Sequence, residues 1–162
     1  MPRKSYWVQP LSYVISVSLG KGCYRHIRIS ADMTFDDLSC AILDAFMFDN
    51  DHLHGFFMDN IFWSRNEDAC IWADDMDGEA IHVSDEVTLR EWELSEGQAF
   101  KYLFDFGDEW RFNCKVLRAM PELTESPQVI RSKGDAPEQY PDWDEDDEYE
   151  DEDEDEDPDG EE

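Results

Sequence analysis

Residues 100–116 constrain the fold more than any other stretch, because apolar and polar side chains alternate through two neighbouring runs. The first run places an aromatic ring at every second position, with Phe100, Tyr102, Phe104 and Phe106. After a short turn the same rhythm returns with Trp110, Phe112, Cys114 and Val116. Successive side chains on a strand point to opposite faces. The pattern therefore predicts a long β-hairpin with one aromatic face.

The register of this hairpin depends on the length of its turn. A three-residue loop places Phe106 opposite Trp110 and Phe104 opposite Phe112, so the aromatic residues share a face. A two-residue turn would instead place Phe106 opposite Glu109, and it needs a β-bulge to restore the shared face. We favour the three-residue loop or the bulged turn.

The remaining pattern changes period along the chain. Alternation over residues 11–19 and 23–29, around a Gly-Lys-Gly turn, predicts a second hairpin. Residues 35–47 show helical spacing, and Thr34 with Asp37 resembles a capping box. The further expected elements are a strand at 52–58 returning at 61–63, a strand at 81–83, a helical turn at 87–92 capped by Ser84 or Asp85, and an edge strand at 129–130.

The order of these elements predicts an α+β fold, because helices and strands do not alternate in βαβ units. We expect a mostly antiparallel sheet with one main packed helix, a ββα start and a long aromatic C-terminal hairpin.

Charge divides the chain into two parts. The formal net charge is −29, and residues 142–162 contain 17 acidic residues and no Lys or Arg. We expect residues 1–141 to form one domain and residues 142–162 to be a disordered acidic tail. Strong acidity argues against direct nucleic-acid binding and against anionic membranes, since both need positive charge. A basic protein partner or a cation fits this charge better.

Cysteine use and hydropathy indicate a reduced cytoplasmic setting. The four cysteines are widely separated and form no C-x-x-C pair, which is typical of buried thiols. The first ten residues lack the apolar core of a signal peptide, and no apolar run of 18 residues occurs.

Three segments together resemble one known family. They are the Y-x-F-D-F-G-D-x-W string at 102–110, the string FMFDNDHLHGF at 46–56 and the string KGDAPEQYP at 133–141. This combination resembles the plasmid Ri Orf-three-like (TnpR-like) domain family over nearly all of the expected domain. The resemblance implies a compact α+β domain, found on plasmids, other mobile elements and chromosomes, whose biochemical role is essentially unassigned.

The chain departs from the family pattern at two places. The family usually has a His shortly after the hairpin Trp, where Arg111, Phe112 and Asn113 stand here. Its late segment usually reads Cys-Pro-Pro-Glu-Asp, where this chain has Asp-Ala-Pro-Glu-Gln at 135–139. Any metal or thiol chemistry of the family would lack two candidates in this chain.

A metal site is one open hypothesis. His52 and His54 share one face of a strand and follow Asp51, a spacing and ligand set that suits a divalent transition metal. Asp108 or Glu109 would complete the site only if the hairpin turn folds over that strand. The alternative is a surface strand whose histidines bond to neighbouring groups, which we favour. We therefore predict no cofactor, with the metal as the alternative.

Other motifs fail on inspection. Asp105-Phe106-Gly107 matches a kinase string without the segments that accompany it, so we expect a hairpin turn. The acidic loop at 74–79 lacks the end ligands of a calcium loop. Cys114 faces the aromatic side, which makes a nucleophilic role unfavourable.

We interpret the chain as a binding or interaction module that is not catalytic, with the question of enzyme activity left open. A site is expected where the hairpin turn approaches the histidines and the late segment. Its residues are Asp105, Asp108, Trp110, His52, His54, Pro137 and Glu138. The acidic tail is expected to attract a basic protein partner, and the alternative is a tail that is only solubilising or autoinhibitory. The alternatives are a metal-dependent enzyme using His52 and His54, and a DNA mimic that occupies a DNA-binding protein.

Overall fold

The computed structural model describes residues 9–20, 22–75 and 78–140. The strands are β1 (Ser12–Gly20), β2 (Cys23–Ser30), β3 (His54–Phe57), β4 (Cys70–Trp72), β5 (His82–Val83), β6 (Ala99–Phe104), β7 (Trp110–Met120) and β8 (Gln128–Lys133). The helices are α1 (Phe35–Ala45), the short α2 (Leu89–Trp92) and the 3₁₀ turn η2 (Glu67–Ala69). The predicted tail at 142–162 lies outside the described residues.

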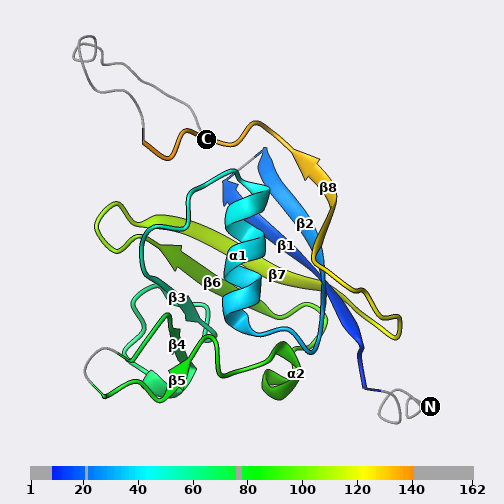
Figure 1. Ribbon diagram of the computed structural model, residues 1–162, viewed down its shortest axis with the longest axis horizontal. Coiled ribbons are helices and arrows are strands. Elements are labelled where there is room, and N and C mark those ends of the chain that lie inside the picture. The colour runs from blue at the N-terminus through cyan, green and yellow to red at the C-terminus, as the bar shows by residue number, and fades with distance from the viewer. Residues whose placement is uncertain (1–8, 21, 76–77, 141–162) are drawn as a thin grey trace.

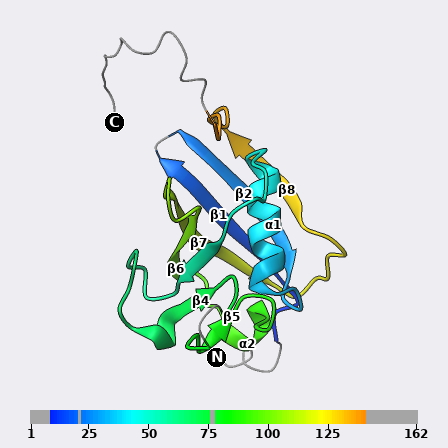
Figure 2. The same ribbon diagram turned by 60° about the vertical axis from the view of Figure 1, so that its left-hand side comes forward.

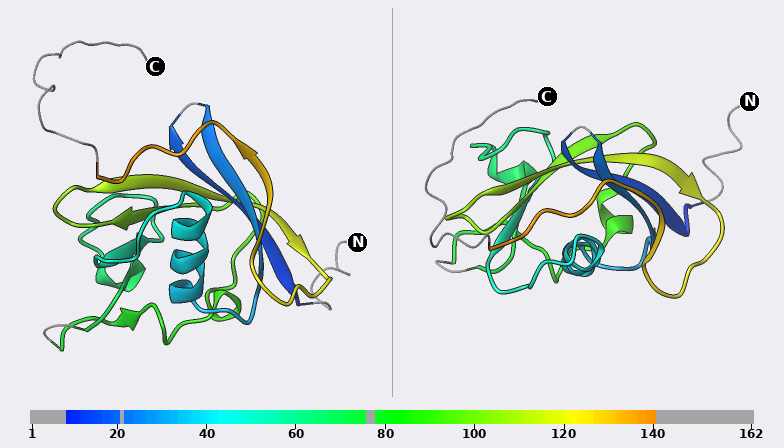
Figure 3. Two further views of the ribbon diagram at one scale, coloured as in Figure 1. Left: turned by 45° about the horizontal axis from the view of Figure 1, so that its top comes forward. Right: turned by 90° about the horizontal axis from the view of Figure 1, so that it is seen from above.

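All eight strands join one sheet, in the order β5-β4-β3-β6-β7-β1-β2-β8 (Figure 1). Every neighbouring pair is antiparallel except β4 and β5, which run parallel. The helix α1 covers one face of this sheet, as Figure 3 shows from above. The predicted α+β class, with its ββα start and long aromatic hairpin, is confirmed.

The helix α1 begins where the sequence predicts. Thr34 accepts a hydrogen bond from the N–H of Asp37, and the Asp37 carboxylate accepts one from the N–H of Thr34. This capping box satisfies two of the free N–H groups of the first turn. Leu38 and Ile42 then point from α1 into the core, and both are fully buried.

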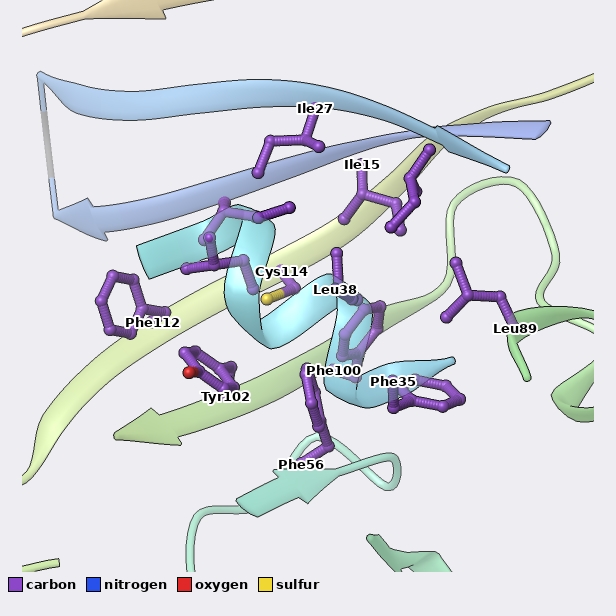
Figure 4. Packing of buried hydrophobic residues seen from close by; sticks show 14 of the residues in the cluster. Ile15, Ile27, Phe35, Leu38, Phe56, Leu89, Phe100, Tyr102, Phe112 and Cys114 are labelled. Carbon is purple, nitrogen blue, oxygen red and sulfur yellow. The ribbon is translucent and has the colours of Figure 1, made fainter. Parts of the chain in front are cut away.

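The core lies between α1 and the sheet face it covers. Figure 4 shows its centre, where Phe35 and Leu38 of α1 meet Phe100 and Cys114 of the central hairpin. Figure 2 shows the same helix from another side, where it contacts β2. Burying each Phe side chain contributes about 1.5–3 kcal/mol, so these rings hold the helix on the sheet.

The central hairpin corrects the predicted register. Phe104 lies opposite Trp110 and Tyr102 opposite Phe112, so the predicted pair of Phe106 and Trp110 is wrong by two residues. The loop spans residues 105–109 because Asp105 leaves the strand with a left-handed φ of 70°. A shift of two preserves the face of every strand residue, so Phe104, Tyr102 and Phe112 share a face as predicted. The prediction is wrong for Phe106, which lies in the loop and packs against Trp63 and Trp72 on the opposite face.

The partner of β3 is also different from the prediction. β4 pairs with β3 through Cys70–Trp72, whereas residues 61–63 form no strand. Trp63 has a left-handed φ of 56°, and Ile61 is 58% exposed, so the chain turns outward there. The strand that closes the pairing comes from a stretch in which the sequence pattern predicts no strand.

The shorter elements follow the sequence more closely. β5 and the edge strand β8 lie at the predicted places, although β8 is longer. The helical turn α2 is present, but Thr88 caps it with Glu91 in a capping box. Ser84 and Asp85, which the sequence pattern proposed as caps, lie one turn earlier.

Candidate functional site

The three segments that carry the family resemblance meet at one end of the sheet. The Nε2 atom of His52 lies 2.7 Å from the Tyr140 hydroxyl and 3.4 Å from Oδ2 of Asp105. The Tyr140 hydroxyl also donates to Oδ2 of Asp51 over 2.8 Å. The expected approach of the hairpin turn to His52 and the late segment is therefore present.

Asp105 occupies the centre of this cluster and is 5% exposed. Its Oδ1 atom accepts hydrogen bonds from the N–H groups of Gly107 and Asp108, at 3.1 and 3.2 Å. Its own N–H donates to the carbonyl of Leu53. A carboxylate that accepts two N–H groups stabilises the left-handed turn that it begins. Asp105 thus sets the turn and also holds His52.

Gln139 fixes the late segment against the chain before β3. Its side-chain amide accepts from the N–H of Asp49 and donates to the carbonyl of the same residue, at 2.6 and 3.1 Å. It also donates to Asp51 over 3.3 Å. The side chains of this cluster contact one another, and they belong to Asp51, His52, Asp105, Gln139 and Tyr140. We call the cluster the clasp, because it joins residues 134–140 to the hairpin turn.

The other predicted residues lie around the clasp. Asp108, Pro137 and Glu138 are exposed, and within the described chain the side chains of these three make no hydrogen bond or ion pair. Trp110 packs its ring edge-on against Phe48 at 4.8 Å, and its buried Nε1–H has no partner among the described residues. The role of these residues in a site stays a prediction.

His54 lies apart from the clasp, although it is two residues from His52. It is 3% exposed, and its Nε2 atom is 2.9 Å from the Ser84 hydroxyl. Its Nδ1 atom is 3.3 Å from the Ser39 hydroxyl, which in turn lies 2.5 Å from the hydroxyl of Tyr102. Burial lowers the pKa of His54 to about 4, so the ring is neutral at pH 7. Ser39 is fully buried as well. Because His54 with its lowered pKa is a weak base and no solvent reaches Ser39, the pair suits a structural role.

The metal hypothesis gains no support from this geometry. Both ring nitrogens of His54 face serine hydroxyls, whereas His52 faces Asp51, Asp105 and Tyr140. Across residues 9–20, 22–75 and 78–140, no group of three or more His, Cys, Asp or Glu side chains is placed to hold a metal ion. A metal site at His52, His54 and Asp51 therefore stays a prediction, and the geometry of the described residues does not support it.

A pocket on the opposite face of the sheet was not predicted from the sequence. It has a volume of about 410 Å³ and lies beside β3 and β4. Its rings Trp72 and Phe106 pack against a buried cluster that is separate from the core covered by α1. Three aromatic rings line it, from Trp63, Trp72 and Phe106. Their centroids are 5.3 Å apart for Trp63 and Phe106, 5.9 Å for Trp72 and Phe106, and 6.3 Å for the two indoles.

Carboxylates orient two of these rings. The indole N–H of Trp72 donates to Oε1 of Glu67 over 3.2 Å, and that of Trp63 donates to Oε1 of Glu109 over 3.3 Å. The side chain of Arg111 donates to the same carboxylate, and these hydrogen bonds lower the pKa of Glu109. The Glu109 carboxylate therefore stays ionised beside the indole.

The backbone of β3 makes room for the Trp72 ring. Gly55 lies opposite Trp72, and a Cβ atom added at Gly55 would lie 3.0 Å from two carbons of the indole. A residue with a side chain would displace the ring from this position. The signal for this pocket in the sequence was the apolar pair Ile71 and Trp72, alone in an acidic stretch.

The charge of the pocket has one sign. Four of its lining residues are acidic and none is Lys or Arg; the acidic ones are Glu67, Asp74, Asp75 and Glu79. Aromatic faces carry negative potential, and carboxylates add to it, so the arrangement favours a cation.

Comparison with known proteins places this fold among proteins without an assigned role. The family model described as plasmid pRiA4b ORF-3-like protein matches residues 13–154. The uncharacterized protein y4hQ of Sinorhizobium fredii is 29% identical over 90 residues, which is 54% of this chain and 43% of that protein. The chain thus spans less than half the length of this relative. A crystal structure of MM3350, a protein of unknown function from Methanosarcina mazei Go1, superposes with a TM-score of 0.64 at 26% identity, over 78% of this chain and 71% of that one.

The helices give one further observation. In the described residues, none of them has the length and apolar character needed to cross a bilayer.

Proposed function

The chain belongs to the plasmid pRiA4b ORF-3-like protein family, and from this premise we propose that it is a non-catalytic binding module for a basic protein partner. The pocket lined by Trp63, Trp72 and Phe106 takes a cationic side chain of that partner. We also propose that the protein acts in the cytoplasm. There the acidic segment, residues 142–162, attracts the partner before the pocket binds the partner's cationic side chain.

The observation that carries the proposal is the lining of the pocket. Three rings lie within 6.3 Å of one another, and the charged lining residues are all carboxylates. A cation within about 6 Å of a ring centroid gains roughly 0.5–2 kcal/mol, depending on how far it is desolvated. Neighbouring carboxylates strengthen this attraction for an ammonium or guanidinium group.

The magnitude also limits what the pocket does alone. Even with three rings, such contacts supply only a few kcal/mol, so a lone side chain binds at about millimolar strength. A partner protein needs further contacts, and long-range attraction by a chain of net charge −29 raises its association rate.

The first test is a titration of the full chain with choline, followed by NMR at the indole Hε1 signals of Trp63 and Trp72. We expect saturable shifts of these two signals because the rings enclose the ammonium group. The matched ligand is 3,3-dimethylbutan-1-ol, which has the shape of choline without its charge. The proposal fails if the neutral ligand produces the same shifts, or if choline leaves both indoles unchanged.

Variants separate the pocket from the general acidity of the chain. We expect Trp72→Leu to weaken choline binding at least about fivefold, since it removes the ring that faces Phe106. Glu67→Gln with Glu79→Gln is expected to weaken it less and to reduce its salt dependence. The control is Asp85→Asn with Glu86→Gln, which removes two exposed charges outside the pocket lining and is expected to leave binding unchanged.

A further inference from the structure

On the strands β1, β2, β6, β7 and β8, the face that points away from α1, here called the outer face, has a charge opposite to that of the whole molecule. The strands β1, β2, β6, β7 and β8 contain no Asp or Glu at all. They hold eight of the 13 Lys and Arg residues, namely Arg25, Arg28, Lys101, Arg111, Lys115, Arg118, Arg131 and Lys133.

Strand pairing places seven of these eight on the outer face. Core residues occupy the other face, and residues opposite each other on antiparallel strands share a face. One cross-strand row runs from Arg131 through His26 and Ser16 to Lys115. The next row runs from Lys133 through Tyr24 and Ser18 to Asn113 and Lys101. The exception is Arg25, which lies on the face covered by α1 and donates to the carbonyl of Ala45 in that helix.

Most of these cations have no carboxylate partner. Within the described residues, the Lys and Arg side chains that form ion pairs are Arg90, with Asp32, and Arg111, with Glu109. Lys115, Arg131 and Lys133 are exposed, and none of them is in an ion pair with a described residue. A basic surface of this kind lowers the free energy of an anionic chain placed over it.

The outer face also offers hydrogen-bonding and stacking groups. The rings of Tyr24 and His26 stack at 5.0 Å with an interplanar angle of 24°. His26 lies opposite Arg131 on the neighbouring strand, and burial together with this neighbouring charge lowers the pKa of His26. Ser16 and Ser18 are partly exposed between these cations.

We propose that the chain's own acidic segment, residues 142–162, docks on this outer face of β8, β2, β1 and β7. Charge complementarity supports this occupant, because residues 142–162 contain 17 carboxylates and no Lys or Arg. The rest of the molecule repels the segment, since the stretch from Asp32 to Glu109 holds 21 acidic residues against Arg65, Arg90 and Lys101.

Tyr140, the last described residue, lies at an end of the sheet from which the acidic segment can reach the basic strands. The clasp fixes Tyr140 beside His52 and Asp105, at the end where β6 stops and β7 starts. Lys133 and Tyr24 lie at that same end, because β8 stops and β2 starts there. Residues 141–162 can extend up to about 70 Å, whereas strands about 4.8 Å apart make the basic face only about 20 Å wide. The segment can therefore cover the face without leaving the molecule, and tethering gives it a high local concentration.

This inference adds to the proposed function without depending on it. The docked segment shields the outer face from other polyanions. A basic protein partner competes with the outer face for the same carboxylates, so its arrival uncovers the basic strands.

The test compares amide spectra of the full chain with those of a full-length variant in which every acidic residue from 150 to 157 becomes its amide. We expect shifts concentrated at Tyr24, His26, Lys115 and Arg131, and we expect about 0.5 M NaCl to move the unmodified chain toward the variant's spectrum. Superposable spectra, or shifts confined to β4 and β5, would overturn the proposal.

Two controls make the result specific. Arg131→Glu is expected to reduce these shifts at least about twofold, whereas Arg65→Glu, an equal charge change at an exposed loop position, leaves them intact. A fifteen-residue oligo-thymidylate is then added to the unmodified chain. If it shifts the same face while neutralising the acidic segment does not, the occupant is nucleic acid and the proposal is wrong.

Discussion

His54 is the residue whose burial has the clearest energetic consequence. Its ring is held neutral between two serine hydroxyls, and burial lowers its pKa to about 4 from an ordinary value of 6.5. The pKa of this histidine is lower in the folded chain than in the unfolded chain, so its contribution to stability is fully present above pH 6.5. The contribution is lost as the pH falls toward 4, because in this range the unfolded chain binds the proton and the folded chain does not. The resulting loss in the free energy of unfolding between pH 6.5 and pH 4 is about 3 kcal/mol.

We therefore predict that His54→Gln, which cannot titrate, flattens the acid side of the stability curve. The free energy of unfolding, measured with urea from pH 7 to pH 4, should fall less steeply in this variant than in the unmodified chain. The other acidic groups titrate in both proteins and cancel in the comparison. Parallel curves across this range would show that His54 does not set the acid sensitivity.

Asp105 carries a prediction about the hairpin turn. Asp105→Ala removes the acceptor of two N–H groups and leaves a left-handed φ to a residue that tolerates it poorly, so we expect a loss of about 2 kcal/mol. Asp105→Asn keeps a side-chain oxygen and tolerates the left-handed region, and it should cost less than half as much. Urea denaturation of both variants decides between this role and a purely electrostatic one, in which Asn would be as damaging as Ala.

The residues of the clasp and those of the pocket differ in how far the sequence reveals them. The clasp residues stand in strings that a family shares, which is why Asp105 and His52 could be named from the sequence. Trp63 and Trp72 lie in an acidic stretch without periodicity, and their meeting with Phe106 depends on a strand of only three residues. No local pattern predicts such a meeting, because it is created by pairing between β3 and β4.

At the scale of elements, the sequence determines faces better than pairings. An alternation with a period of two places Phe104 and Phe112 on one face, but the same alternation fits a register shifted by two residues. The predicted register of the hairpin differs from the observed one by this shift. The sequence predicts the helix correctly because Thr34, Asp37 and the apolar positions of α1 all indicate a helix beginning at the same place. The partner of β3 was missed because the competing segment at 61–63 is apolar, while the true strand follows a 3₁₀ turn capped by Asn66.

Arg25 links three elements and supports a prediction at this scale. It is 7% exposed, and its guanidinium donates to the carbonyls of Ala45, Lys133 and Tyr24 at 3.1, 3.0 and 2.9 Å. The last turn of α1 has no basic residue of its own, so Arg25 supplies the positive charge that the helix C-terminus favours.

Arg25→Met keeps the apolar stem and removes these hydrogen bonds, and we expect it to lower the free energy of unfolding by about 2–4 kcal/mol. Arg25→Lys should recover only part of this loss, because a single ammonium group cannot reproduce the fork that reaches α1 and β8 together. Hydrogen exchange should show faster exchange in α1 and β8, with β3 and β4 little changed. Uniform acceleration in all elements would mean that Arg25 acts on the global fold.

At the scale of the whole molecule, charge segregation could only partly be predicted. Counting residues gave the acidic excess and the run at 142–162. It could not show that the cations gather on one side, because that side is assembled from five strands spread over residues 12–133. The expectation of an acidic molecule was therefore correct on average and incomplete for the outer face.

The position of β1 in the sheet has a consequence for the chain as it is synthesised. β1 is an inner strand, yet its two neighbours are β2, which follows directly, and β7, which ends at Met120. At about 5–20 residues per second, the ribosome takes roughly 5–20 s to add the 90 residues between the end of β2 and the end of β7. During that interval the first hairpin carries an open hydrogen-bonding edge on β1, and the nascent chain depends on chaperones or on speed to keep other strands from pairing with it.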